Sequence, residues 1–131
     1  MQSILLVEDS KFLRMASERA LARAGYSVVS TDDGEQALRV ARESHPDLIL
    51  LDMLLPRLGG PEVLRALKKD PLTAEIPVVV LSSLSQKNET RLKKEGAAAY
   101  FEKSKLGLDT DSQSLIQVVI EALAQRHTSP N

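Results

Sequence analysis

The sequence contains no cysteine, which excludes both a disulfide framework and a thiolate metal site. Aromatic residues make up 3% of the chain, too few for a surface that stacks nucleic-acid bases. No apolar run approaches the roughly 20 residues that span a bilayer, and the N-terminus lacks a signal-peptide pattern. The 17 basic and 18 acidic residues nearly cancel, so neither nucleic acid nor a membrane is expected as a partner. These absences agree with a cytoplasmic location.

The length of 131 residues predicts a single domain. We place this domain at residues 1–126 and expect a flexible tail at residues 127–131. A chain of this size buries roughly two thirds of its unfolded surface. The predicted domain therefore needs no disulfide or structural metal to hold its core.

Three short aliphatic runs dominate what the sequence does contain. They are Ile4–Val7, Leu48–Leu51 and Val78–Leu81. None alternates apolar with polar residues, which is typical of strands buried on both faces of a parallel sheet. Two weaker strand candidates are Tyr26–Ser30 and Ala98–Glu102.

The segments around these strands have the spacing and end signals of helices. Alternation of strand and helix predicts a parallel sheet covered by helices on both faces. The first predicted helix runs from Leu13 to Ala24 and is ended by Gly25, and the second is capped by Asp33, with Gln36 in the reciprocal capping position. The third begins at Gly60-Pro61, and its Leu64 and Leu67 face the core. The fourth runs from Gln86 to Lys94 and is capped by Ser85, and the last has an apolar stripe from Leu115 to Leu123.

Charged and hydroxyl residues follow the predicted strands at their carboxyl ends, where open α/β sheets form their sites. The first strand is followed by Glu8-Asp9, the third by Asp52, the fourth by Ser82-Ser83 and the fifth by Lys103. Three carboxylates at one edge repel one another, at about 4 kcal/mol for each close pair at ~4 Å and an effective dielectric of ~20. One ammonium does not offset this repulsion, so we expect a divalent cation.

Oxygen ligands in an incomplete protein cage favour Mg2+, for which Mn2+ could substitute. Asp9 and Asp52 are the predicted direct ligands, and Glu8 is expected to act through a metal-bound water. The two histidines lack metal-ligand spacing. The pairs Lys68-Lys69 and Lys93-Lys94 are expected to lie on solvated helix faces.

In these residues the sequence resembles the receiver domains of response regulators in two-component signalling. Asp52, within the segment Leu50–Pro56 and followed by Gly59-Gly60, stands at the position of the family's phosphoacceptor. The resemblance implies an α/β fold with a doubly wound, five-stranded parallel sheet in the flavodoxin-like order 2-1-3-4-5. It also implies that the backbone carbonyl of Leu54 is a further metal ligand.

The function implied by this resemblance is a phosphorelay. A sensor histidine kinase or a histidine phosphotransfer protein would pass a phosphoryl group from its phosphohistidine to Asp52, and the chain would be a phosphorylatable signalling domain rather than a classical enzyme. Lys103 and Ser82, with the adjacent Ser83, would stabilise the phosphoryl group, and Tyr100 would be the switch aromatic. The surface formed by the fourth helix, the fifth strand and the last helix would respond. The output protein stays open, and the chain is either a monomer or a phosphorylation-dependent dimer.

Two departures from the family pattern bear on this function. Ser104 follows Lys103, where the family usually has a proline in a cis peptide. Either the chain tolerates a non-proline cis bond, which costs about 3 kcal/mol, or the loop takes a different path and Lys103 is aimed less firmly. Leu54 and Leu84 stand where family side chains flank the path of the hydrolytic water. Because leucine offers that water no hydrogen bond, we expect slow self-dephosphorylation.

Three other functions compete with this interpretation. A phosphorylation-independent, receiver-like protein-binding module stays open because of Ser104. A haloacid-dehalogenase-like phosphohydrolase would carry its nucleophile on the first strand, with a second acid two residues later, and the chain has neither feature. A flavodoxin-like flavin carrier needs a hydroxyl-rich phosphate loop, which Asp9 to Phe12 does not supply.

Overall fold

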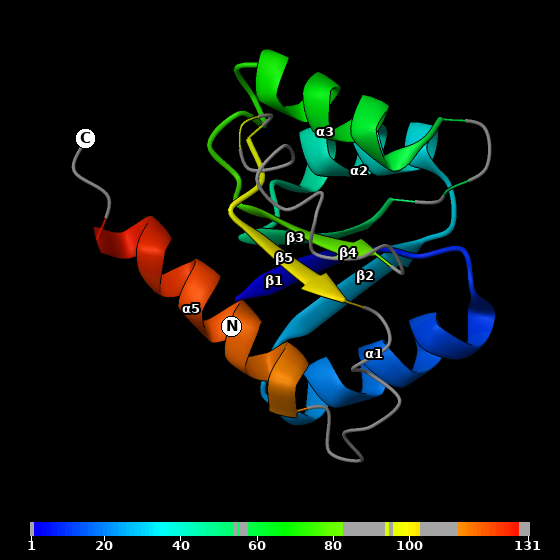
Figure 1. The fold of residues 1–131 in the computed structure, drawn as a ribbon, viewed down its shortest axis with the longest axis vertical. Helices are drawn as coiled ribbons and strands as arrows, with labels where there is room; N and C mark the ends of the chain where they lie inside the picture. Colours follow the sequence, from blue (N-terminus) through cyan, green and yellow to red (C-terminus); the bar gives the residue numbers. More distant parts are fainter. Residues whose placement is uncertain are drawn as a thin grey trace.

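The sheet determines the architecture of this chain (Figure 1). A computed structural model describes residues 2–53, 55, 58–82, 94, 96–102 and 113–128. Five strands form one sheet in the order β2-β1-β3-β4-β5, and every neighbouring pair is parallel. The predicted fold class and strand order are therefore confirmed. The strands are β1 Ser3–Val7, β2 Ser27–Thr31, β3 Leu48–Asp52, β4 Val78–Ser82 and β5 Ala99–Glu102.

Four helices are described, and their labels follow Figure 1. They are α1 Lys11–Arg23, α2 Gly34–Ser44, α3 Gly60–Lys69 and α5 Gln113–Thr128. The last two residues of α5 fall within the predicted tail, and residues 129–131 lie outside the described part. The predicted fourth helix and its Ser85 cap also lie outside it, apart from Lys94. None of the described helices is long and apolar enough to cross a membrane.

Two apolar layers, one on each face of the sheet, explain the unbroken aliphatic runs. Successive strand side chains point to opposite faces, so a strand covered on both sides is apolar at every position. Leu5 and Val7 of β1 pack with α2 and α3, whereas Ile4 and Leu6 pack with α1 and α5. Figure 1 shows α2 and α3 together on one side of the sheet and α1 and α5 on the other.

The apolar sequence pattern matches the buried face of α3 better than that of α1. Leu64 and Leu67 of α3 are fully buried, as expected. On α1, Ala16 and Ala24 recur at helical spacing with Leu13 and Leu21 but are exposed, and Ser17 is buried instead. Burying a methyl group gains little free energy, so alanines do not decide which way a helix faces.

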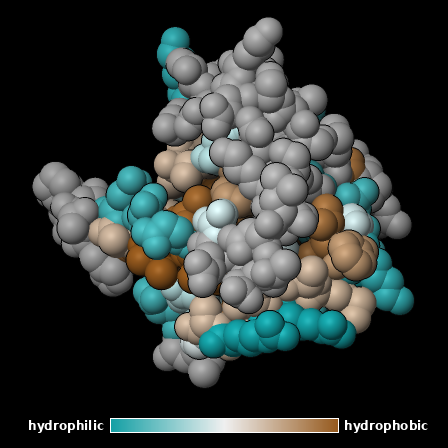
Figure 2. All heavy atoms as spheres, turned by 60° about the horizontal axis from the view of Figure 1, so that its bottom comes forward, coloured by the Kyte–Doolittle hydropathy of each residue, from teal (hydrophilic) through white to brown (hydrophobic). Residues whose placement is uncertain are grey.

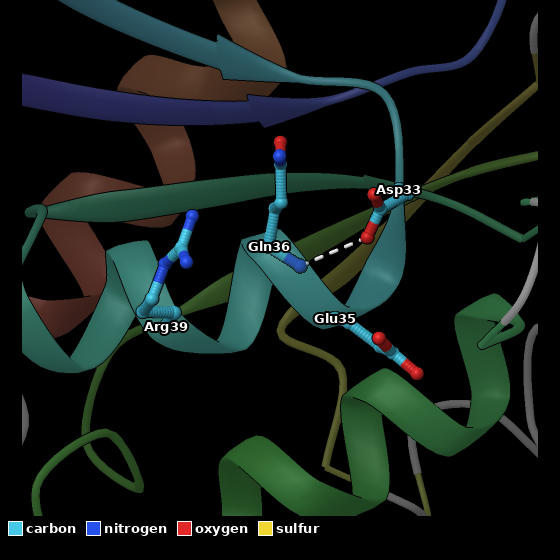
Figure 3. Close-up of a pocket in the computed structure, with 4 residues that line it drawn as sticks. All are labelled: Asp33, Glu35, Gln36 and Arg39. Carbon is cyan, nitrogen blue, oxygen red and sulfur yellow. Dashed lines mark hydrogen bonds between the residues drawn. The ribbon is translucent and has the colours of Figure 1, made fainter.

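The start of α2 shows half of the predicted capping box. Asp33 accepts a hydrogen bond from the backbone N–H of Gln36 at 2.9 Å, which fits an N-cap. The backbone N–H of Asp33, however, donates to the hydroxyl of Thr31 at 3.4 Å. In Figure 3 the Gln36 side chain points away from Asp33. A hydroxyl from the end of β2 thus replaces the reciprocal bond.

Lys68 departs from its predicted solvated position, whereas its neighbour Lys69 is exposed as expected. The Lys68 ammonium donates to the backbone carbonyls of Ala74 at 3.0 Å and Ile76 at 2.8 Å. Burial lowers the pKa of Lys68 below its ordinary value, because desolvation penalises the charged form. The carbonyl contacts supply polar partners that water would otherwise provide.

Candidate functional site

The carboxyl ends of β1 and β3 meet at one edge of the sheet, where the strand order reverses. The two strands are paired in register, with Val7 opposite Leu51. Glu8 and Asp9 directly follow β1, and Asp52 is the last residue of β3. Carboxylate oxygens of these three residues all lie within 4.8 Å of one another. The acidic cluster expected from the sequence therefore forms.

The three acids differ in their exposure. Glu8 and Asp52 are each 1% exposed, whereas Asp9 is exposed. One oxygen of the Glu8 carboxylate accepts the backbone N–H of Ser10 at 3.1 Å, and Arg14 donates to the Glu8 carbonyl at 3.0 Å. Glu8 is thus tied to the start of α1, while Asp9 reaches the surface beside Asp52.

Gly60 holds the end of β3 in place, a role that the sequence reading did not assign to it. The backbone N–H of Gly60 donates to the Met53 carbonyl at 3.1 Å. A Cβ atom on Gly60 would lie 2.5 Å from the Met53 Cα and 2.6 Å from the Asp52 carbonyl oxygen. Only glycine fits so close to this backbone. The Gly59-Gly60 pair was the available sequence signal, but only the fold shows which glycine contacts the site.

The donor set of the cluster fits a hard divalent cation. The converging atoms are carboxylate oxygens, which Mg2+ and Mn2+ prefer over softer ligands. Two of the three acids are withdrawn from water, so their mutual repulsion is weakly screened. A bound cation would offset that repulsion.

The remaining predicted site residues are only partly described. Ser82 ends β4 beside Glu102 of β5, but its hydroxyl lies outside the described part. Tyr100 of β5 is half-buried and packs against the apolar layer that includes α2 and α3. Four further predicted residues lie outside the described part, namely Leu54, Ser83, Leu84 and Lys103.

A hollow of about 390 Å³ lies on α2 and is lined by Asp33, Glu35, Gln36 and Arg39 (Figure 3). Its lining includes none of the three clustered acids. The described hollow and the acidic cluster are therefore separate features.

Comparison with known families identifies the family to which this fold belongs. The sequence profile of the response regulator receiver domain matches residues 4–119. The chain belongs to this family. The receiver family is a family of signalling domains rather than classical enzymes.

Relatives of this receiver domain come from several bacteria. The polar-differentiation response regulator DivK of Brucella ovis is 37% identical over 103 residues, covering 78% of this chain and 84% of that protein. A gliding motility regulatory protein of Myxococcus xanthus is 41% identical over 114 residues, covering 86% of this chain. The chain spans only 14% of that longer protein.

A solved receiver domain has a closely similar fold. It belongs to a sensor histidine kinase of Pseudomonas aeruginosa PAO1 and has a magnesium ion coordinated in its active-site cleft. It superposes with a TM-score of 0.81 at 27% sequence identity, covering 94% of this chain and 98% of that one.

We predict that Gly60→Ala destabilises the receiver domain by about 1–3 kcal/mol, the usual cost of overpacking. Its Cβ would meet backbone atoms of Met53 and Asp52, which have no room to yield. Gly59→Ala is the matched control, because its Cβ would meet the flexible tip of the Glu62 side chain at 2.6 Å. Urea unfolding measures both variants, and equal stabilities would contradict the role of Gly60.

Proposed function

We propose that this receiver domain accepts a phosphoryl group on Asp52 in a Mg2+-dependent reaction. The observation that carries the proposal is the gathering of Glu8, Asp9 and Asp52 carboxylates within 4.8 Å at the carboxyl edge of the sheet. Asp9 and Asp52 would bind the metal directly, and Glu8 would bind it through a water. The Leu54 carbonyl would complete the ligand set, as the family resemblance implies.

In the proposed transfer, a carboxylate oxygen of Asp52 attacks the phosphorus of a phosphohistidine on the partner. The new O–P bond forms as the P–N bond breaks, and the imidazole of the partner leaves with a proton from solvent. Bound Mg2+ would neutralise charge on the transferring oxygens. The Gly60 contact holds Asp52 at the end of β3. Lys103 and Ser82, with the adjacent Ser83, would contact the remaining phosphoryl oxygens.

The exposed face of α1 supports a macromolecular donor, such as a sensor histidine kinase or a histidine phosphotransfer protein. Phe12, in the first turn after Asp9, is 79% exposed, and Met15 is 41% exposed. Lys11 and Arg19 are exposed beside them. The acid within α1, Glu18, is half-buried and accepts a hydrogen bond from Ser30.

A donor that covers this face would present apolar and acidic side chains. In Figure 2 the α1 side of the molecule comes forward, with a teal hydrophilic band beside brown apolar surface. A protein that brings a histidine to the buried Asp52 must cover the adjacent start of α1. The exposed phenylalanine and the basic residues would then be contacted in the complex.

The output of the switch is proposed by resemblance. Phosphorylation would draw in Ser82, turn Tyr100 inward and change the surface of the fourth helix, β5 and α5. Ile120 of α5 is 46% exposed, so α5 presents an apolar residue at its surface. The output protein, and the choice between a monomer and a phosphorylation-dependent dimer, stay open. A cytoplasmic location is part of the same proposal.

Acetyl phosphate provides the direct test of phosphorylation. With Mg2+ present, intact mass spectrometry should show the gain of one phosphoryl group on the native chain and none on Asp52→Asn, which lacks the nucleophile. Omitting Mg2+ should abolish the gain. No gain on the native chain would refute the proposal and favour a phosphorylation-independent binding module.

Metal binding should raise the stability of the native chain. At free Mg2+ ten times the Kd, the stabilisation is about 1.4 kcal/mol, which corresponds to a rise in Tm of roughly 5 °C. Asp9→Asn and Asp52→Asn should lose most of this rise, because each removes a direct ligand. Glu43→Gln, a change of an exposed acid on α2, is the control. An equal rise with NaCl at matched ionic strength would exclude a specific metal site.

The acyl phosphate on Asp52 should be long-lived, because Leu54 and Leu84 offer the attacking water no hydrogen bond. Replacing Leu54 with Asn supplies a hydrogen-bonding side chain and should speed decay about tenfold, the effect of roughly 1.4 kcal/mol on the barrier. The decay is followed by intact mass after the small donor is removed. Loss from the native chain within seconds would refute the expectation.

Phe12→Ala should slow phosphorylation by a protein donor roughly tenfold or more, since a buried aromatic anchor is a typical interface hot spot. The rate with acetyl phosphate should not change, because a small donor does not contact Phe12. The protein donor is a purified phosphorylated histidine phosphotransfer domain that phosphorylates the native chain. Unchanged transfer from that domain would exclude Phe12 from the donor interface.

A further inference from the structure

Lys68 lies at the amino edge of the sheet, opposite the acidic cluster. Its ammonium donates to the carbonyls of Ala74 and Ile76, which lie in the segment that leads into β4. Ile76 is buried, and the carbonyl of the next residue, Pro77, accepts the backbone N–H of Ile49 at 3.0 Å. Lys68 therefore joins the last turn of α3 to the start of β4.

The same side chain contacts the segment that leads into β5. A Cβ atom on Gly96 would lie 2.7 Å from the Lys68 Cγ, with Cδ and Cε at 3.2 and 3.3 Å. The backbone of Gly96 therefore lies directly against the Lys68 stem, and its φ of 113° also favours glycine. Two residues later, the backbone N–H of Ala98 donates to the Val78 carbonyl at 2.8 Å.

These contacts place one side chain between the starts of two neighbouring strands. β4 carries Ser82 at its carboxyl end, and β5 carries Tyr100. Val80 of β4 is paired with Tyr100 in the register. A change in the spacing of the strand starts would therefore alter the backbone that carries both switch residues.

We propose that Lys68 is a positioning residue of the switch: it fixes the starts of β4 and β5 relative to each other, so that Ser82 and Tyr100 respond to phosphorylation together. This inference rests on the proposed function, because it concerns the response to a phosphoryl group on Asp52. Lys68 contacts neither the metal site nor the reacting atoms. It acts through the backbone segments on either side of its stem.

The variant that tests this role is Lys68→Met, which keeps an apolar stem against Gly96 and removes both hydrogen bonds to carbonyls. Lys68→Arg retains donors and should rescue the response. Lys69→Met changes the exposed neighbour. Thr73→Val removes another buried hydrogen bond at the end of α3, from the Thr73 hydroxyl to the Leu67 carbonyl at 2.7 Å, and controls for a general loss of stability.

Three measurements separate the possible outcomes. Intact mass after treatment with acetyl phosphate and Mg2+ reports phosphorylation, which Lys68→Met should retain in full. Amide exchange at Ala98 should become about tenfold faster in Lys68→Met, as local opening becomes easier. The change in the Tyr100 NMR signals on phosphorylation should fall to less than about half of the native change. Thr73→Val and Lys69→Met should keep the native Tyr100 response.

A native Tyr100 response in Lys68→Met would overturn the inference, as would an equal loss of response in Thr73→Val. A native chain that gains no phosphoryl group would instead refute the proposed function, and unchanged Ala98 exchange in Lys68→Met would then refute the positioning role separately. Should Lys68→Met not fold, Lys68→Gln, which retains a donor, undergoes the same comparison with smaller expected changes.

Discussion

Repulsion among three carboxylates is the constraint on which the site depends. The parallel pairing of β1 and β3 brings Glu8, Asp9 and Asp52 to one edge. Two of these acids are buried, so their charges are weakly screened. The register of the two strands keeps the backbones that carry these acids close together, and apolar layers on both faces hold that register. The hydrophobic core thus stabilises an arrangement that is electrostatically unfavourable without a cation.

Glu8 links this electrostatic site to the surface that a partner would contact. Its carboxylate accepts the backbone N–H of Ser10, and the Ser10 hydroxyl in turn accepts the N–H of Leu13 at the start of α1. The first turn of α1, with Phe12 exposed on it, is therefore fixed by a residue of the acidic cluster. Because one short segment supplies both features, a donor that contacts α1 would be aligned with Asp52 by the same backbone that places the acids.

The sequence predicted the features that local patterns encode and missed those that depend on distant segments. Unbroken aliphatic runs predicted the buried strands, since both faces of each strand are covered. Lys68 resembled any surface lysine, because its burial requires Gly96 from a segment far along the chain. Ala16 on α1 recurs at the spacing of the apolar residues but is exposed, because alanine contributes too little burial to orient a helix. The role of Gly60 depends on a close approach to Asp52 that spacing alone does not reveal.

Hydrogen bonds stabilise the amino edge of the sheet, whereas mutually repelling carboxylates gather at its carboxyl edge. The Asp47 carboxylate accepts the backbone N–H of Ser3 at 2.8 Å, joining the starts of β1 and β3, and Lys68 joins α3 to the start of β4. These hydrogen bonds stabilise the end of the sheet that takes no part in the proposed chemistry. Charge can then change at the opposite end while the strand starts stay fixed. In the proposed function the domain would respond to one added phosphoryl group without unfolding, and this separation between a stable edge and a reactive edge would serve that response.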